Sequence, residues 1–335
     1  MTLGLALLVF LTGGGFLVWA GVVLASAGDE LAERTGLGRL FVGMLIMALA
    51  TSLPELATDV VAAQAGAPDI AVGDLFGSSM ANMAILAVID LRHRGRVWAR
   101  VELGQARVAS IAIGLTALAT VAILTPPGVA LGWVGIDTIA IAGGYVVAVA
   151  WIHRSPISRR ANASVLPRPL GIADESERSF ASVIGRLALG IAVVLGSAPA
   201  VAYAGREIAT AGGLSEGFVG TSLVAVSTSL PELVTALAAV RISAYDLAVG
   251  NLLGSNAVNM ALLVLVDLAY TPGPVLAAVS PSQAVAGVGA ILLVSLALTV
   301  IVHGAETRLA KLEPDALLLL ATYGGLLFAV WRVGG

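Results

Sequence analysis

Stretches of about 20 residues with almost no charge recur along this whole chain, and each could cross the hydrocarbon core of a membrane, which is about 30 Å thick. The composition agrees, because 58% of the 335 residues are hydrophobic and only 12% are charged, whereas about 25% are charged in a typical soluble protein. The sequence therefore predicts an all-α, multi-pass protein of the cell (inner) membrane, with the lipid bilayer as its main partner.

The apolar stretches divide into ten predicted transmembrane helices. Their ranges are 3–27, 39–64, 69–90, 103–124, 130–152, 181–204, 216–240, 246–270, 282–302 and 314–332. One long polar connection separates the first five from the last five. We therefore predict a first five-helix repeat at 1–152, a cytoplasmic linker at 153–180 and a second five-helix repeat at 181–335. The first stretch ends in Ala25-Ser26-Ala27, which resembles a signal-peptidase site, but no basic residue precedes it, and we interpret it as a transmembrane helix.

Basic residues are concentrated in every second connection between these spans. If the N-terminus is outside the cell, 16 of the 18 Lys and Arg residues lie on the cytoplasmic side, leaving only Arg206 and Arg332 outside. Cytoplasmic loops carry an excess of Lys and Arg. We therefore expect both termini to be extracytoplasmic.

The chain repeats itself at an offset of 177 residues, which is the separation of Glu55 and Glu232. The segment 51–56, Thr-Ser-Leu-Pro-Glu-Leu, recurs at 228–233, and the spans that follow align without a gap. Because five crossings, an odd number, separate the two copies, they should enter the membrane in opposite directions. Inverted repeats of this kind are typical of secondary transporters whose binding site lies at the membrane midplane. Asp90 and Asp267, at matching span ends, are expected at the membrane interface.

Each copy of the segment places one glutamate, Glu55 or Glu232, in the middle of an apolar span. An ionised carboxylate at that depth costs about 3 kcal/mol or more. Each glutamate directly follows a proline, which removes a backbone donor and breaks or kinks the helix. The glutamates could instead tie helices together, but that role does not explain why they recur in both halves.

The other polar groups around these glutamates would offer oxygen atoms. The candidate metal ligands are Glu55, Glu232, Thr51, Thr228, Ser52, Ser229, Ser78, Ser255, Asn82 and Asn259, with the backbone carbonyls of Ala48 and Ala225. Hard cations such as Ca²⁺ and Na⁺ prefer oxygen, whereas softer metals prefer Cys or His, and the chain has no Cys and only three His. The hydroxyls could alternatively bond to helix carbonyls and the asparagines could join helices. We expect protons to compete with the cations, and we predict no cofactor, nucleic acid or obligatory protein partner.

Two copies of Thr-Ser-Leu-Pro-Glu, each followed by Gly-(Asn/Asp)-x-x-Gly-Ser-(Asn/Ser)-x-x-Asn, resemble the alpha-repeats of the sodium/calcium exchangers. The resemblance is to the prokaryotic type of this family, within the cation/calcium antiporter superfamily, and rests on residues 41–90 and 218–267. It implies that the second, third, seventh and eighth helices surround four adjacent cation sites. It also implies that the first and sixth helices slide across this core to alternate access.

The resemblance also implies a role for each motif residue. Glu55 and Glu232 would bind both calcium and sodium. Calcium would also bind Thr51 and Thr228, sodium would bind Ser52, Ser229, Ser78, Ser255 and the main-chain oxygens of Ala48 and Ala225, and Asn82 and Asn259 would lie in the middle of the site. Two positions depart from the family pattern. Asn259 stands where some microbial members have Asp, and Asp74 stands where the family usually has Asn, as at Asn251. We expect Asp74 near the edge of the site.

These patterns predict a secondary antiporter that exchanges Na⁺ for Ca²⁺ by alternating access, not an enzyme. A Ca²⁺/H⁺ exchanger, or an exchanger of Na⁺ for Mg²⁺ or another divalent cation, is the alternative on the same scaffold. A channel would conduct without a counter-ion. An intramembrane enzyme would need unequal carboxylate environments and usually a nucleophile or a metal, which the symmetric copies and the lack of Cys disfavour.

Overall fold

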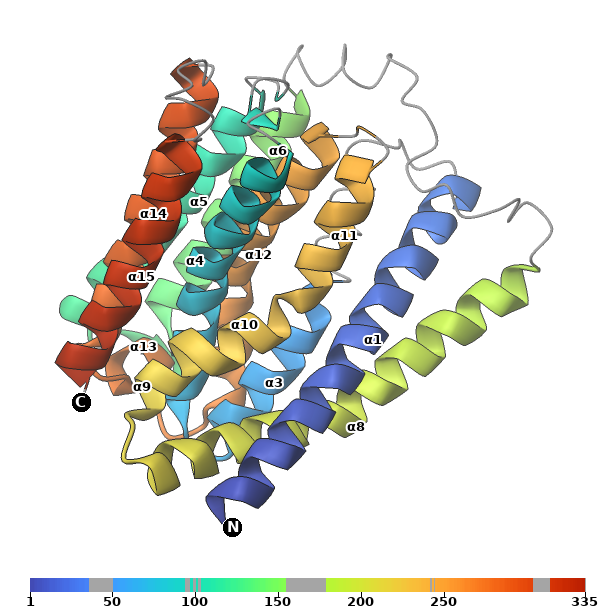
Figure 1. Cartoon of the computed structure of the whole chain (residues 1–335). Helices are drawn as coiled ribbons and strands as arrows, with labels where there is room; N and C mark the ends of the chain where they lie inside the picture. The colour runs from blue at the N-terminus through green and yellow to red at the C-terminus, as the bar shows by residue number, and fades with distance from the viewer. Residues whose placement is uncertain are drawn as a thin grey trace.

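In the part of the chain that the structure describes, the protein is a bundle of long helices with one short β-hairpin (Figure 1). The computed structural model describes residues 1–35, 51–93, 97–98, 101, 104–154, 179–241, 243, 245–303 and 314–334. Figure 1 shows α1 and α8 side by side on one flank of the molecule and running in opposite directions, while the other long helices stand together beside them.

The first half of the chain forms five described helices and a short hairpin. These are α1 (Leu3–Thr35), α3 (Leu53–Gln64), α4 (Pro68–Arg92), α5 (Gly104–Leu124), the strands β1 (Ala130–Leu131) and β2 (Val134–Gly135), and α6 (Ile136–Arg154). The prediction of a helix from residue 130 is wrong for its first turn, because β1 and β2 pair as an antiparallel hairpin there. Gly132 allows this turn, since its φ of 69° lies in the left-handed region.

In the second half, the segment that carries Glu232 is divided into several short helices. This half consists of α8 (Phe180–Gly212), α9 (Glu216–Val219), the π-helix η3 (Gly220–Val224), α10 (Ala225–Thr228), α11 (Leu230–Arg241), α12 (Tyr245–Ala269), α13 (Val275–Ala278), α14 (Gln283–His303) and α15 (Pro314–Gly334). Matching helices have the same length: α1 and α8 have 33 residues each, α3 and α11 have 12, and α4 and α12 have 25. Each of these pairs begins 177 residues apart, which is the offset found in the sequence.

The chain is an integral membrane protein. Seven described helices are long and apolar enough to cross a bilayer, and the bent pair Glu216–Thr228 and Leu230–Arg241 makes up to eight. Two of the ten predicted spans are not among these. The span 39–64 lies partly in residues 36–50, outside the described ranges, and the span 130–152 corresponds to α6, whose apolar part, Ile136–Ile152, is shorter.

The centre of the bundle is formed by α4 and α12. In the most apolar 18-residue stretch of α4, 89% is buried inside the protein, whereas the same share is 67% for α12 and 17% for α15. Glycines permit this close packing. A Cβ atom at Gly77 of α4 would lie 2.6 Å from the backbone Cα of Thr221 in η3, and one at Gly220 would lie 2.5 Å from the backbone oxygen of Ile70. The helix that carries Asp74, Ser78 and Asn82 therefore contacts the π-helix almost backbone to backbone.

Asp90 and Asp267 lie near the ends of α4 and α12 and are buried, with 1% and 0% of their surfaces exposed, and their location at the membrane interface stays a prediction. Asp267 accepts hydrogen bonds from the amides of Gly135 (2.8 Å) and Val275 (2.7 Å) and from the hydroxyl of Thr138 (2.6 Å). Asp90 accepts one from the amide of Val97 (3.1 Å). These carboxylates organise the loops at the ends of the central helices by binding backbone donors that would otherwise be buried without partners.

Replacing Asp267 by alanine should destabilise the protein by about 2–4 kcal/mol, because three buried donors lose a charged acceptor. Thermal unfolding of the purified protein in detergent measures this loss. Asp315→Asn, which removes one half-buried carboxylate charge from the first turn of α15, should leave the unfolding temperature nearly unchanged. Equal unfolding temperatures for Asp267→Ala and the unmodified protein would contradict this anchoring role.

Candidate cation site

The two matching helix segments break at the same place. Ser52 precedes α3 with φ −82° and ψ −1°, and Ser229 precedes α11 with φ −84° and ψ 2°. The next two residues of each helix are Leu-Pro, and proline is tolerated in the first turn of a helix but not in its interior. At the second break the axis bends by 41°. The predicted breaks before the glutamates are confirmed at both described positions.

Glu55 and Glu232 lie in the first turns of α3 and α11, and both side chains are 0% exposed. The two carboxylates are close enough for Glu55 to act electrostatically on Glu232. None of the buried polar side chains in the described ranges is a Lys, Arg or His. The charge of this pair therefore meets no buried basic side chain there, and a bound cation or proton must balance it.

Hydroxyl and amide groups from both halves surround Glu55. Ser229 donates a hydrogen bond to its Oε1 at 3.3 Å, across the junction of the two halves. Ser52, Ser78 and Asn259 also lie beside this carboxylate. Thr51 lies beside Glu232, so the break of each half supplies a side chain to the glutamate of the other half.

A second group of ligand-type oxygens joins α4 to the segment before the second break. The hydroxyl of Thr228 donates to Asp74 Oδ1 at 2.9 Å, Ser78 donates to the same oxygen at 3.3 Å, and the two hydroxyls are 3.5 Å apart. Asp74 is 0% exposed and also interacts electrostatically with Glu55. Asp74, expected near the edge of the site, thus contacts two of the predicted ligands.

The remaining predicted ligands differ in their hydrogen-bond partners. Asn82 donates to Asn256 Oδ1 at 2.8 Å, so its amide joins α4 to α12 while its own oxygen stays free of donors from the described residues. The hydroxyl of Ser255 is buried and also lacks a partner there. The carbonyl of Ala225 accepts from the amide of Ser229 at 3.0 Å and from Thr228 at 3.3 Å. Ala48 lies outside the described residues.

Many buried oxygens at this junction receive no hydrogen bond from the described part of the chain. They are Ser52 Oγ, Glu55 Oε2, both carboxylate oxygens of Asp59 and of Glu232, Asp74 Oδ2, Asn82 Oδ1, Ser255 Oγ and Asn259 Oδ1. Buried polar atoms are nearly always paired in native proteins, so a concentration of unpaired oxygens needs an explanation. No three acids or histidines within the described ranges converge on one point. A cation would therefore bind a mixture of carboxylate, hydroxyl and amide oxygens.

Asp59 is the one acid at this junction that the sequence analysis missed. It lies one turn after Glu55 on α3, is 0% exposed, and interacts electrostatically with Asp74 and Glu55. The signal was present in the sequence, since a spacing of four places Asp59 and Glu55 on the same helix face. It was overlooked because its counterpart in the second half is Ala236, so the repeat does not reproduce it.

Helix α1 lies directly across both breaks. A Cβ atom at Gly21 would be 2.5 Å from Cγ of Pro231 and 3.6 Å from Cγ of Pro54. At Gly14 it would be 2.7 Å from the hydroxyl of Ser227, on α10. Helix α1 therefore packs against the segments that carry both glutamates.

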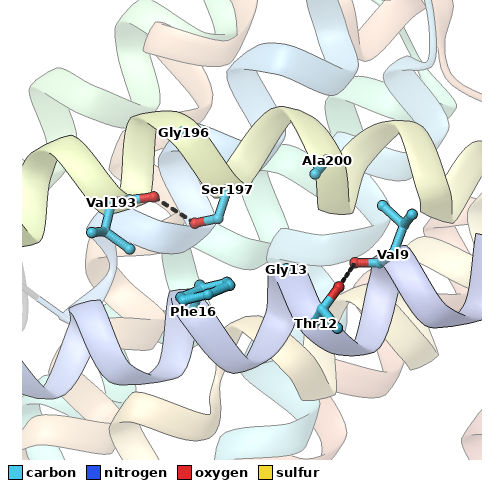
Figure 2. Close-up of a pocket in the computed structure, with 8 residues that line it drawn as sticks. All are labelled: Val9, Thr12, Gly13, Phe16, Val193, Gly196, Ser197 and Ala200. Carbon is cyan, nitrogen blue, oxygen red and sulfur yellow. Dashed lines mark hydrogen bonds between the residues drawn. The ribbon is translucent and has the colours of Figure 1, made fainter.

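A groove of about 320 Å³ opens between α1 and α8, away from the glutamates. Figure 2 shows Phe16 of α1 and Val193 of α8 in its lining, and the hydroxyls of Thr12 and Ser197 bonded to carbonyls of their own helices. With its hydroxyls already bonded, the groove offers a mainly apolar surface. It is not a cation site.

Comparison with known proteins agrees with this arrangement. Residues 5–151 and 182–332 match the family described as sodium/calcium exchanger protein, one match in each half. The chain belongs to the sodium/calcium exchanger family. It is therefore a membrane antiporter by family, and its similarity to a transporter family extends over most of its length.

Individual relatives cover the chain to different extents. CaxA, a candidate antiporter of Alkalimonas amylolytica, is 27% identical over 324 residues, which are 95% of this chain and 97% of CaxA. The inner membrane protein YrbG of Escherichia coli (strain K12) is 27% identical over 283 residues, 82% of each chain. The sodium/calcium exchanger MaX1 of Methanosarcina acetivorans is 30% identical over 79 residues, covering 24% of this chain and 23% of MaX1.

Solved structures of the sodium-calcium exchanger NCX_Mj share the fold. The structure soaked with 2.5 mM Na⁺ and 0.1 mM Sr²⁺ superposes with a TM-score of 0.61 at 21% identity, covering 98% of this chain and 99% of that one. The structure soaked without Na⁺ and Ca²⁺ gives a TM-score of 0.59 at 21% identity. At this level of identity the likeness shows the fold alone.

Proposed function

We propose that the protein exchanges Na⁺ for Ca²⁺ by alternating access, at a site built on Glu55 and Glu232. One observation carries the proposal: each half contributes one fully buried glutamate beside a helix break, and the two interact across the junction of the halves. Several surrounding oxygens have no donor from the described residues. A dehydrated hard cation would satisfy both the charge and these oxygens.

The donor set supports Ca²⁺ and Na⁺ over softer metals. Ca²⁺ takes 6–8 oxygen ligands in flexible geometry, and hydroxyls of Ser52, Ser78 and Ser229 lie beside Glu55. Two carboxylates are neutralised by one Ca²⁺ or by two Na⁺, so the ions would compete for overlapping ligands. We therefore infer that Glu55 and Glu232 are shared ligands, and that Thr51, Thr228, Ser78 and Asn259 complete the coordination.

Antiport follows from the charge of the empty site. Two buried carboxylates with no bound cation would be costly to move past apolar helices, whereas the loaded, neutral site would move at lower cost. Only the cation-loaded protein would then switch its access. This requirement couples the two ion fluxes, which a channel does not do.

We infer that the chain has ten transmembrane helices in two inverted repeats of five. The equal lengths of matching helices and the opposite directions of α1 and α8 support this topology (Figure 1). The location of the termini outside the cytoplasm remains a prediction from the distribution of Lys and Arg. Cysteine labelling of residues near each terminus from one side of intact cells tests it.

Flux measurements on the purified protein in lipid vesicles test the proposed function. An outward Na⁺ gradient should drive uptake of radioactive Ca²⁺, and a pH gradient of equal driving force should not. Uptake driven only by the pH gradient would replace this proposal with Ca²⁺/H⁺ exchange. Uptake of Mg²⁺ in place of Ca²⁺ would indicate a different divalent substrate, and Ca²⁺ flux without any counter-ion would indicate a channel.

A further inference from the structure

Two acids of the first half, Asp59 on α3 and Asp74 on α4, face each other in the interior of the protein. Both side chains are 0% exposed, and their carboxyl groups interact directly. Apart from the contact between the two carboxyl groups themselves, three of the four carboxylate oxygens have no hydrogen-bond partner among the described residues, namely both oxygens of Asp59 and Oδ2 of Asp74. Two buried like charges in this position repel unless something positive lies between them.

At the matching positions, the second half has two neutral residues in place of the two acids. The counterparts of Asp59 and Asp74 are Ala236 and Asn251, both buried and both neutral. Asn251 donates a hydrogen bond to the hydroxyl of Thr235 at 3.1 Å, which joins α12 to α11.

The first half lacks that connection between its helices. Thr58, the counterpart of Thr235, donates to the carbonyl of Pro54 at 2.8 Å, as Thr235 does to that of Pro231 at 3.0 Å, but no hydrogen bond from Asp74 to Thr58 is found among the described residues. The acid pair thus stands where the second half has a neutral link. Helix packing alone does not require two carboxylates here, since the second half packs the equivalent helices without them.

We propose that Asp59 and Asp74 form an additional cation site, which takes a monovalent hard cation such as Na⁺ and makes the two halves functionally unequal. The site rests on the proposed function only in that it adjoins the exchange site, since the hydroxyl of Thr228 donates to Asp74 and is also one of the inferred calcium ligands. Among the described residues, the first half contributes three carboxyl groups to this junction, those of Glu55, Asp59 and Asp74. The second half contributes that of Glu232.

The oxygen count favours a monovalent ion over Ca²⁺. The pair offers unpaired oxygens from only two carboxylates, and no third acid or histidine in the described ranges converges with them on one point. Ca²⁺ needs 6–8 oxygens, whereas only three carboxylate oxygens of the pair are unpaired, because the hydroxyls of Thr228 and Ser78 already donate to the fourth. A single Na⁺ between the two carboxylates would offset most of their repulsion.

Equilibrium binding of radioactive Na⁺ to the full-length protein in detergent tests this site without relying on transport. The double variant Asp59→Ala/Asp74→Asn gives the first half the residues of the second. At saturating Na⁺ the unmodified protein should bind about one more Na⁺ per chain than this variant. Glu207→Gln, which removes a carboxylate of α8 outside the site, should bind the same number as the unmodified protein.

Three outcomes separate this inference from the proposed function. If the unmodified protein and the double variant bind the same number of Na⁺ ions per chain across pH 6 to 9, the additional cation site is refuted. A proton shared by the two acids would then explain the pair. An extra Na⁺ that persists in a protein without Na⁺-driven Ca²⁺ uptake supports the site and overturns the exchange function. If the double variant elutes as aggregate, Asp59→Asn alone, which keeps the side-chain shape, is expected to lose the same ion.

Discussion

Vesicles containing the Glu232→Gln protein are expected to lose Na⁺-driven Ca²⁺ uptake by about 100-fold or more. Removing one charged partner from a buried, cation-bound site costs about 3–5 kcal/mol, and each 1.4 kcal/mol corresponds to a factor of ten in affinity. Glu55→Gln should give a loss of the same order, because the two glutamates occupy equivalent positions in the two halves and both are fully buried. Initial rates of radioactive Ca²⁺ uptake at equal protein content measure the effect.

The glutamine variants keep the size of the side chain, so they should fold. Their elution volume in size-exclusion chromatography should match that of the unmodified protein. Arg206→Gln provides a control, since Arg206 contacts Glu216 and the carbonyl of Ala65 outside the site. If either glutamine variant retained more than about half of the uptake rate, a site built on both glutamates would be refuted.

Gly77→Ala is expected to destabilise the protein by about 1–3 kcal/mol or more, which is the usual cost of overpacking a well-packed interior. The added Cβ would lie 2.6 Å from Cα and closer still to the carbonyl oxygen of Thr221, and 2.7 Å from Cβ of Ala225. The first two are backbone atoms, so no side-chain rotation can make room. Thermal unfolding in detergent should show the loss.

Gly114→Ala supplies the matched control for this substitution. Gly114 lies in the middle of α5, where a Cβ atom would meet nothing within 4 Å. Alanine there should be neutral or stabilise the helix by about 0.5–1 kcal/mol, because glycine is the poorer helix former. The two alanine variants are therefore expected to shift the unfolding temperature in opposite directions. A stabilising effect of Gly77→Ala would show that α4 and η3 do not approach as closely as described.

Sequence periodicity and the internal repeat account for most of the fold. The apolar stretches predict the long helices because a chain in lipid must satisfy its backbone within each helix. The prolines before Glu55 and Glu232 predict the breaks, since proline cannot continue the preceding helix. The hairpin at 130–135 escaped prediction because its short strands lie next to an apolar span and carry the same composition.

The candidate site was predictable only where the repeat marked it. Glu55, Glu232 and their neighbouring hydroxyl residues recur at equal spacing, so one sequence sufficed to select them. Asp59 does not recur, and Asp74 recurs as Asn251, so the repeat gave no reason to join these two acids to the site.

The sequence by itself determined that this chain spans a membrane, that it is duplicated, and which pair of acids is repeated inside it. Only the tertiary structure decided which oxygens meet, because contacts such as Ser229 with Glu55 and Thr228 with Asp74 join helices more than 150 residues apart in the chain. Local patterns report the direction of a side chain along its own helix. They do not report which helix packs against it, and the close approach at Gly77 and Gly220 sets that partner.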